Sequence, residues 1–85
     1  MNYLRYELDA GPNNIIQVNL DKRAYVRLMD YSNFQNYHNG RQYKYYGGLA
    51  NVSPAKIRPP YQGHWYLVID LDGHAGTVRS SVNIL

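Results

Sequence analysis

Hydrophobic and polar residues alternate with a period of two along most of this chain, which is the pattern of strands that bury one face. In "YLRYEL", Leu4, Tyr6 and Leu8 share one face while Arg5 and Glu7 occupy the other. The same alternation recurs in "IIQVNL", "AYVRLM", "HWYLVIDL" and "TVRSSVNIL". We therefore predict an all-β fold, a small antiparallel β-sandwich or partly closed barrel of seven to eight short strands.

The inward positions of these strands supply the predicted core. Its members are Leu4, Val18, Leu20, Val26, Leu28, Trp65, Leu67, Ile69, Val78 and Val82. Trp65 begins an inward-facing series and is expected to anchor the core. The alternative for this tryptophan is a stacking platform for a sugar or a base.

Turn-forming residues separate the predicted strands. "DAGPNN" follows the first strand, "LDKRA" is short enough for a hairpin-like connection, and "DGHAG" predicts a tight turn between the last two strands. In the centre, "RQYKYY" and "AKIR" are weaker strand candidates. Residues 32–38 predict one or two helical turns, with Ser32 as N-cap and Gly40 beyond the C-terminal end.

The length and the residue usage limit what the chain can be. Its 85 residues predict a single domain, residues 1–85, with a modest core. Without cysteine there is neither a disulfide nor a thiolate metal site, which suits a cytoplasmic location. Arg5, Glu7 and Asp9 stand where a signal peptide needs apolar residues, and the apolar run "WYLVI" is too short to span a bilayer. We expect a soluble cytoplasmic domain with no membrane partner.

Positive charge is concentrated in the middle of the chain. Between Asp30 and Asp70 no acidic residue occurs, whereas Arg41, Lys44, Lys56 and Arg58 all do. The segment between Asp30 and Asp70 therefore has a charge of +4. The rest of the chain has a charge of −1, which gives the net charge of +3. Such a distribution favours anionic ligands at a concave surface, although sparse cations also serve simply to keep strand faces soluble.

Aromatic residues are unusually dense in one polar stretch, "DYSNFQNYHNGRQYKYY", residues 30–46. It holds five tyrosines and one phenylalanine in seventeen positions. Tyrosine combines an apolar body with a polar tip, so these rings could cover a loop that cannot be fully buried. They could equally form a recognition surface, on which the rings stack while Asn33, Asn36, Asn39 and Arg41 hydrogen-bond to a ligand.

Four blocks of the sequence carry a family resemblance: "VRLMDYSNF", "YHNGRQYKYYGG", "PPYQGHWYLVIDL" and "VRSSVNIL". Through them the chain resembles domain-of-unknown-function family 1883, a small bacterial family, over nearly its whole length from Tyr3 to Ile84. The most specific parts are the YYGG element and the GHW before the penultimate predicted strand. The resemblance implies an all-β fold, and some members of that family lie N-terminal to TIR-type domains in bacterial signalling or defence proteins.

Recognisable catalytic and metal-binding patterns do not occur. There is no cysteine nucleophile, no GxSxG elbow and no HExxH motif. His38, His64 and His74 lack the close spacing that brings metal ligands together. We predict that the protein is not an enzyme and has no catalytic residues, no metal site and no cofactor.

These observations favour a non-catalytic binding or sensor module that recognises a small ligand or a protein partner. The predicted ligand-binding residues are Tyr37, Arg41, Tyr43, Tyr45 and His64, with Arg41 pairing with an anion through its planar guanidinium group. The first alternative is a small β-barrel that binds single-stranded nucleic acid. A carbohydrate-binding module is a second alternative, and a structural unit that forms homo-oligomers through strand edges is a third.

Overall fold

Residues 3–85 are described by a computed structural model and form seven strands and one helix. In chain order these elements are β1 (Leu4–Ala10), β2 (Ile16–Leu20), β3 (Ala24–Met29), α1 (Tyr31–His38), β4 (Tyr46–Ala50), β5 (Ala55–Ile57), β6 (Gly63–Asp70) and β7 (Ser80–Ile84). Every strand pairing is antiparallel.

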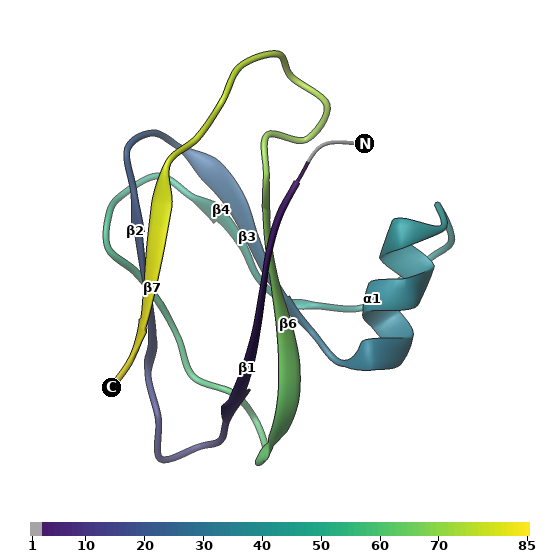
Figure 1. Ribbon diagram of the computed structural model, residues 1–85, viewed down its shortest axis with the longest axis vertical. Helices are drawn as coiled ribbons and strands as arrows, with labels where there is room; N and C mark the ends of the chain where they lie inside the picture. Colours follow the sequence, from purple (N-terminus) through teal and green to yellow (C-terminus); the bar gives the residue numbers. More distant parts are fainter. Residues whose placement is uncertain (1–2) are drawn as a thin grey trace.

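The strands form two facing sheets with the helix outside them. One sheet has four strands in the order β1-β6-β3-β4, and the other has three in the order β5-β2-β7. Figure 1 shows three layers: the three-stranded sheet, the four-stranded sheet, and α1 beyond the outer face of the latter. The prediction of a small antiparallel β-sandwich is confirmed, with seven strands in residues 3–85.

One side of the sandwich is bridged by a side chain of β1. The Tyr6 hydroxyl donates to the backbone carbonyl of Ser80 at 3.2 Å and shares a second hydrogen bond with the Ser80 Oγ at 2.7 Å. This contact ties the edge strand β1 of one sheet to the edge strand β7 of the other. The two sheets are thus held together at this edge without a continuous backbone ladder.

The inner faces of the sheets make one core, as the alternation predicted. Its buried members are Leu8, Ala10, Ile16, Val18, Ala24, Val26, Leu28, Trp65, Leu67 and Ile69. Trp65 is fully buried and its indole N–H donates to the Ala10 carbonyl at 3.1 Å, so the predicted core anchor is confirmed. Leu20, Val78 and Val82 are half-buried against this core.

Leu4 is the one predicted core residue that is exposed, with 38% of its surface accessible. It pairs with Ile69 across the β1–β6 ladder, so its position along the strand is an inward one. Alternation fixes which face a side chain lies on, but it does not fix whether an opposing side chain covers that position.

The hairpin-like connection predicted at "LDKRA" is wrong, and so is a tight turn as the whole connection between the last two strands, because both connections cross between the sheets. Residues 21–23 lead from β2 in the three-stranded sheet to β3 in the four-stranded sheet, and residues 71–79 lead from β6 to β7 in the opposite direction. Neighbouring strands lie about 5 Å apart and facing sheets about 10 Å apart. Because three extended residues can reach about 10 Å, a short connection does not distinguish a hairpin from a crossing.

The turn predicted at "DGHAG" does form locally. Asp72 and Gly73 have φ of 54° and 82°, and the His74 N–H donates to the Leu71 carbonyl at 3.1 Å. Two successive positive φ values are typical of a type I′ turn, and an Asp-Gly pair favours it. The chain then continues to the other sheet instead of pairing back with β6.

The predicted helix exists, but its start was misplaced. The N-cap is Asp30, whose carboxylate accepts the Asn33 backbone N–H at 2.9 Å, and not Ser32. Asp30 follows β3 directly, and its side chain satisfies one of the free N–H groups of the first turn. At the other end, Gly40 lies beyond the helix with φ of 73°, as expected.

The strand predicted at "RQYKYY" is also displaced, because β4 begins only at Tyr46. The Arg41 and Lys44 N–H groups are used by α1: they donate to the Asn36 carbonyl and to the Asn33 Oδ1, each at 2.8 Å. The "AKIR" segment does form a strand, β5, which ends at Ile57.

Candidate functional site

The aromatic residues of α1 cover the outer face of the four-stranded sheet. Phe34 and Tyr37 are buried with Met29 and Val68 in a second apolar cluster, separate from the inter-sheet core. The Phe34 ring stacks on Tyr66 of β6 with centroids 4.8 Å apart. In this part of the segment the rings act as a structural cover.

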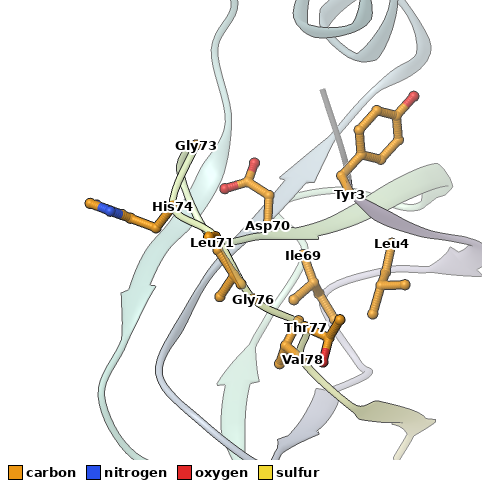
Figure 2. A pocket seen from close by; sticks show the side chains of 11 residues that line it. Tyr3, Leu4, Ile69, Asp70, Leu71, Gly73, His74, Gly76, Thr77 and Val78 are labelled. Carbon is orange, nitrogen blue, oxygen red and sulfur yellow. The ribbon is translucent and has the colours of Figure 1, made fainter.

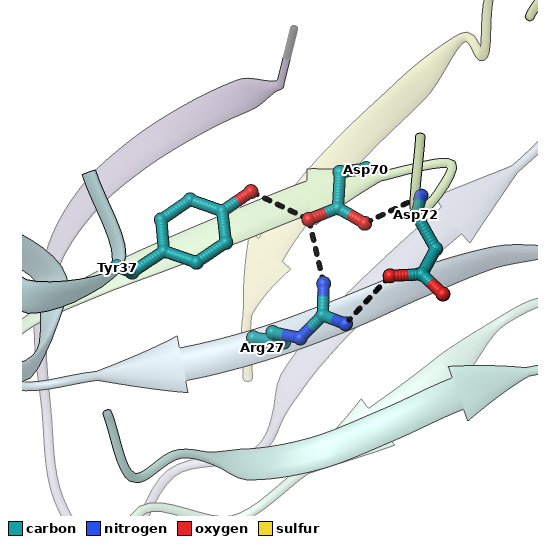
Figure 3. A network of polar contacts seen from close by, with 4 residues as sticks. All are labelled: Arg27, Tyr37, Asp70 and Asp72. Carbon is teal, nitrogen blue, oxygen red and sulfur yellow. Dashed lines mark hydrogen bonds and ion pairs between the residues drawn. The ribbon is translucent and has the colours of Figure 1, made fainter. Parts of the chain in front are cut away.

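A buried polar network lies under the helix and joins it to the sheet (Figure 3). Arg27 of β3 donates from Nη1 to the Asp70 Oδ2 at 2.6 Å, and the Tyr37 hydroxyl donates to the same oxygen at 2.5 Å. The other oxygen of Asp70 accepts the Asp72 backbone N–H at 2.9 Å. Asp70 therefore holds a strand, a helix and a turn together.

The Arg27 guanidinium is also enclosed by aromatic rings. Its carbon lies 4.6 Å from the centroid of the Tyr25 ring and 5.3 Å from that of Tyr45. Both distances lie within the range of cation–π attraction. On its open side, Nη2 lies 3.7 Å from the Asp72 carboxylate.

The protonation states of this network follow from its contacts. Burial opposes charge on Arg27, but the hydrogen bond to Asp70 and the attraction of that carboxylate prevail, so the pKa of Arg27 lies above its ordinary value. Burial, and after it the hydrogen bond to Asp70, raise the pKa of Tyr37 far above the ordinary value for tyrosine. Arg27 therefore stays cationic and Tyr37 stays a neutral donor, as suits a network that holds α1 in place.

A polar hollow lies where the chain leaves α1. We call it the Arg41 hollow, and its lining residues are Asn33, Asn36, Gly40, Arg41, Gln42, Tyr43 and Lys44. It is open to solvent and its volume is about 780 Å³. It combines two cations, three side-chain amides and the half-buried ring of Tyr43.

The backbone around the Arg41 hollow is fixed by the helix end. The Arg41 N–H donates to the Asn36 carbonyl and the Gly40 N–H to the Tyr37 carbonyl, a pair of bonds that defines a Schellman motif. Lys44 is tied to the first turn by its N–H bond to the Asn33 Oδ1. Both cationic residues are thus anchored to α1 through their backbones.

The structure brings together some of the five residues predicted to bind a ligand. Arg41 and Tyr43 line the Arg41 hollow, and Tyr45 lies beside it, its ring centroid 5.7 Å from that of Tyr43. Tyr37 is only 2% exposed and its hydroxyl is bound to Asp70, so its role is to support the ring of Tyr43, 5.1 Å away. His64 lies apart from these residues, near the edge strand β1.

His64 is held between two carboxylates of β1. Its Nδ1 lies 2.8 Å from Asp9 Oδ1 and its Nε2 lies 3.1 Å from Glu7 Oε1. The hydrogen bond to Asp9 first, and then that to Glu7, raise the pKa of His64 above its ordinary value. Nearby, Arg5 lies 3.6 Å from Glu7, and the Tyr66 ring contacts the imidazole edge-on. This exposed group favours a positively charged histidine.

We expect the pKa of His64, measured by NMR titration, to lie above about 6.5 and to fall when Asp9 is replaced by asparagine. Because the folded-state pKa is raised, the stabilisation by His64 is fully present below the unfolded pKa and is lost as pH rises through the folded pKa. Asp21→Asn, a matched change of an exposed aspartate elsewhere, should leave the His64 titration unchanged. If the pKa of His64 is the same in Asp9→Asn as in the unaltered protein, the hydrogen bond between His64 and Asp9 is contradicted.

A metal site and a membrane-spanning helix were also considered for the part of the chain that the structure describes. Among residues 3–85, no group of three or more His, Asp or Glu side chains could hold a metal ion together. No helix within the same range is long and apolar enough to cross a membrane.

The buried pair of Arg27 and Asp70 was not predicted from the sequence, and Lys44 was predicted only as one of four cations that favour an anionic ligand. The available signal was a charged residue inside each of two strongly apolar strands, "AYVRLM" and "WYLVID". Their pairing depends on register: Asp70 lies opposite Tyr25, two residues from Arg27, which is a diagonal neighbour across the ladder. Lys44 lines the Arg41 hollow because residues 39–45, between α1 and β4, are coil and not the predicted strand.

Searches of curated proteins and of solved structures found no match. One family model does match, over residues 1–85, and its description is "Domain of unknown function (DUF1883)". The chain therefore belongs to the DUF1883 family.

Proposed function

We propose that this domain is a non-catalytic binding module that recognises a small anionic ligand in the Arg41 hollow. The ligand's phosphate or carboxylate group would pair with Arg41 and Lys44, and a planar part would lie against Tyr43 and Tyr45. The observation that carries this proposal is that, among residues 3–85, neither Arg41 nor Lys44 has an acidic partner within ion-pair distance although both line one hollow.

The helix end supports this reading. A helix C-terminus normally repels anions, because its last carbonyl groups carry partial negative charge. Here the carbonyls of Gln35, Asn36 and Tyr37 each accept a backbone N–H. These three bonds, of which those to Asn36 and Tyr37 form the Schellman motif, weaken that repulsion and fix the backbone of Arg41 before a ligand arrives.

The placement of the other two cations argues for a compact ligand over a nucleic-acid strand. Lys56 lies on β5 in the opposite sheet, and Arg58 donates to the Pro12 carbonyl at 2.6 Å, next to the turn after β1. A single-stranded nucleic acid needs a continuous basic path with stacking rings. Because Arg41 and Lys44 lie in the segment after α1 while Lys56 and Arg58 lie on and just after β5, the four cations offer only a local pair.

The biological role that we propose is sensing or regulation in bacterial signalling or defence, within the cytoplasm. Its support is the family resemblance and the absence of cysteine from the chain. A bound ligand would contact Arg41, which is linked to α1, and α1 is linked through Tyr37 to the buried Asp70. Through these contacts, binding of a ligand in the Arg41 hollow would affect the position of α1 on the four-stranded sheet.

Phenyl phosphate is the probe that tests the site, since it carries one ring and one phosphate. We expect saturable NMR shifts of the amides of residues 33–45. Binding should be at least about tenfold weaker in Arg41→Ala, because charge-assisted bonds contribute about 1.5–3 kcal/mol. Lys44→Ala should weaken binding less. Lys56→Ala is the matched control and should bind like the unaltered protein.

A titration with an oligothymidylate separates the alternative. Binding of single-stranded DNA would fall steeply with salt, with a slope of about −0.7 per neutralised phosphate. It would also weaken equally on loss of Lys44 or Lys56. Tight oligonucleotide binding of that kind, or no saturable shift with phenyl phosphate, would contradict the proposal.

A further inference from the structure

A second cavity lies at the open end of the sandwich, and it has no lining residue in common with the Arg41 hollow. Its volume is about 530 Å³. It is bounded by the start of β1, the end of β6 and the 71–79 connection that crosses from one sheet to the other. We call it the open-end cavity (Figure 2).

This cavity continues the inter-sheet core. Ile69 is part of the buried core, Leu71 and Val78 pack against it, and all three also line the cavity. Leu4 lies beside Ile69 in the ladder and faces the cavity, which explains why an inward-facing leucine is partly exposed. In most sandwiches this position between the sheets is filled by side chains of the opposite sheet.

Three of the polar side chains around the cavity are directed elsewhere, whereas the Thr77 hydroxyl lies beside Val78 (Figure 2). Figure 2 shows the Asp70 carboxylate, the Tyr3 hydroxyl and the His74 ring all turned away from the converging side chains of Leu4, Ile69 and Val78. Asp70 is bound to Arg27 and Tyr37, and the Tyr3 hydroxyl lies 2.7 Å from the His38 Nδ1. A charged group placed inside would find the Thr77 hydroxyl but no charged lining side chain turned toward it, and burial of a charge without a charged partner is costly.

We propose that the open-end cavity binds a small uncharged apolar molecule between the two sheets, with the 73–76 turn lying over it. The volume lies in the usual range for small-molecule pockets. The driving force is removal of both the ligand and the exposed Leu4 surface from water. This site is independent of the Arg41 hollow, since it needs neither of the hollow's cations.

1-Octanol and octanoate test this proposal as a matched pair of probes that differ in charge. In amide NMR titrations of the full chain, octanol is expected to shift Leu4, Ile69, Leu71 and Val78 in a saturable way. Octanoate is expected to bind at least tenfold more weakly. No saturable octanol binding, equal or tighter octanoate binding, or shifts centred on residues 33–44 would each overturn the inference.

Filling the cavity provides the second arm of the test. Leu4→Trp should weaken octanol binding at least tenfold, whereas the same change at Leu49, an exposed residue of β4, should not. Val78→Phe fills the cavity from the opposite side and replaces Leu4→Trp if that variant fails to fold. Concentration-dependent self-association that Leu4→Trp abolishes, with no response to octanol, would assign the cavity to a second copy of the chain instead.

Discussion

Replacing Asp70 with asparagine is expected to lower the free energy of unfolding by about 3–5 kcal/mol. The change keeps the shape of the side chain but removes the charge that balances Arg27 in a nearly dry site. An unpaired buried charge is strongly destabilising, whereas an intact pair adds little net stability. Because a small domain has a total of about 5–15 kcal/mol, urea unfolding should show a large loss.

Asp72→Asn is the matched control for this experiment. Asp72 also approaches Arg27, at 3.7 Å, but its side chain is 57% exposed. Exposed ion pairs contribute about 0–1 kcal/mol, so we expect a loss in that range. If Asp70→Asn costs no more than Asp72→Asn, the network does not stabilise the fold in the way described.

A double substitution examines the cause of the loss. Arg27→Met removes the cation, so Asp70→Asn in that background no longer leaves a buried charge unpaired. We expect the double variant to be clearly more stable than the sum of the two single losses predicts. Strict additivity would show that the two side chains do not act as a pair.

Truncation of the core gives the second large expected effect. Leu67→Ala should reduce the free energy of unfolding by about 2–5 kcal/mol, because it removes buried methyl groups and leaves a cavity. Leu67 is 0% exposed on β6, where it lies between Tyr6 of β1 and Leu28 of β3. Neighbours on both sides are fixed by backbone ladders, so the site has little freedom to collapse.

The same substitution on the surface is the control. Leu49 lies on the edge strand β4 and is 46% exposed. Leu49→Ala should change stability by no more than about 0.5 kcal/mol. Similar losses at both positions, measured by thermal or urea unfolding, would mean that the sandwich core does not dominate stability.

The sequence by itself determined the local features of the protein. Alternation with a period of two placed Val18, Val26 and Leu67 on inner faces, because successive strand side chains point to opposite sides of a sheet. Gly40 marked the helix end, since a left-handed conformation there favours glycine. The Asp-Gly pair at residues 72–73 likewise marked its turn.

The candidate site was predicted only in part. Arg41, Tyr43 and Tyr45 were close in sequence and lie close in space. Whether each ring faced water was decided by α1, which buries Tyr37 against the sheet and leaves Tyr45 exposed. A tyrosine is equally suited to either position, so composition could not separate cover from recognition surface.

Only the tertiary structure decided which strands became neighbours. Arg27 and Asp70 lie 43 residues apart in the chain and meet because β3 and β6 pair in one sheet. The short connections at 21–23 and 71–79 instead cross between sheets, and the second leaves Leu4 facing an open cavity. Strand pairing and sheet crossing depend on contacts between distant segments, whereas alternation and turn chemistry act over a few residues.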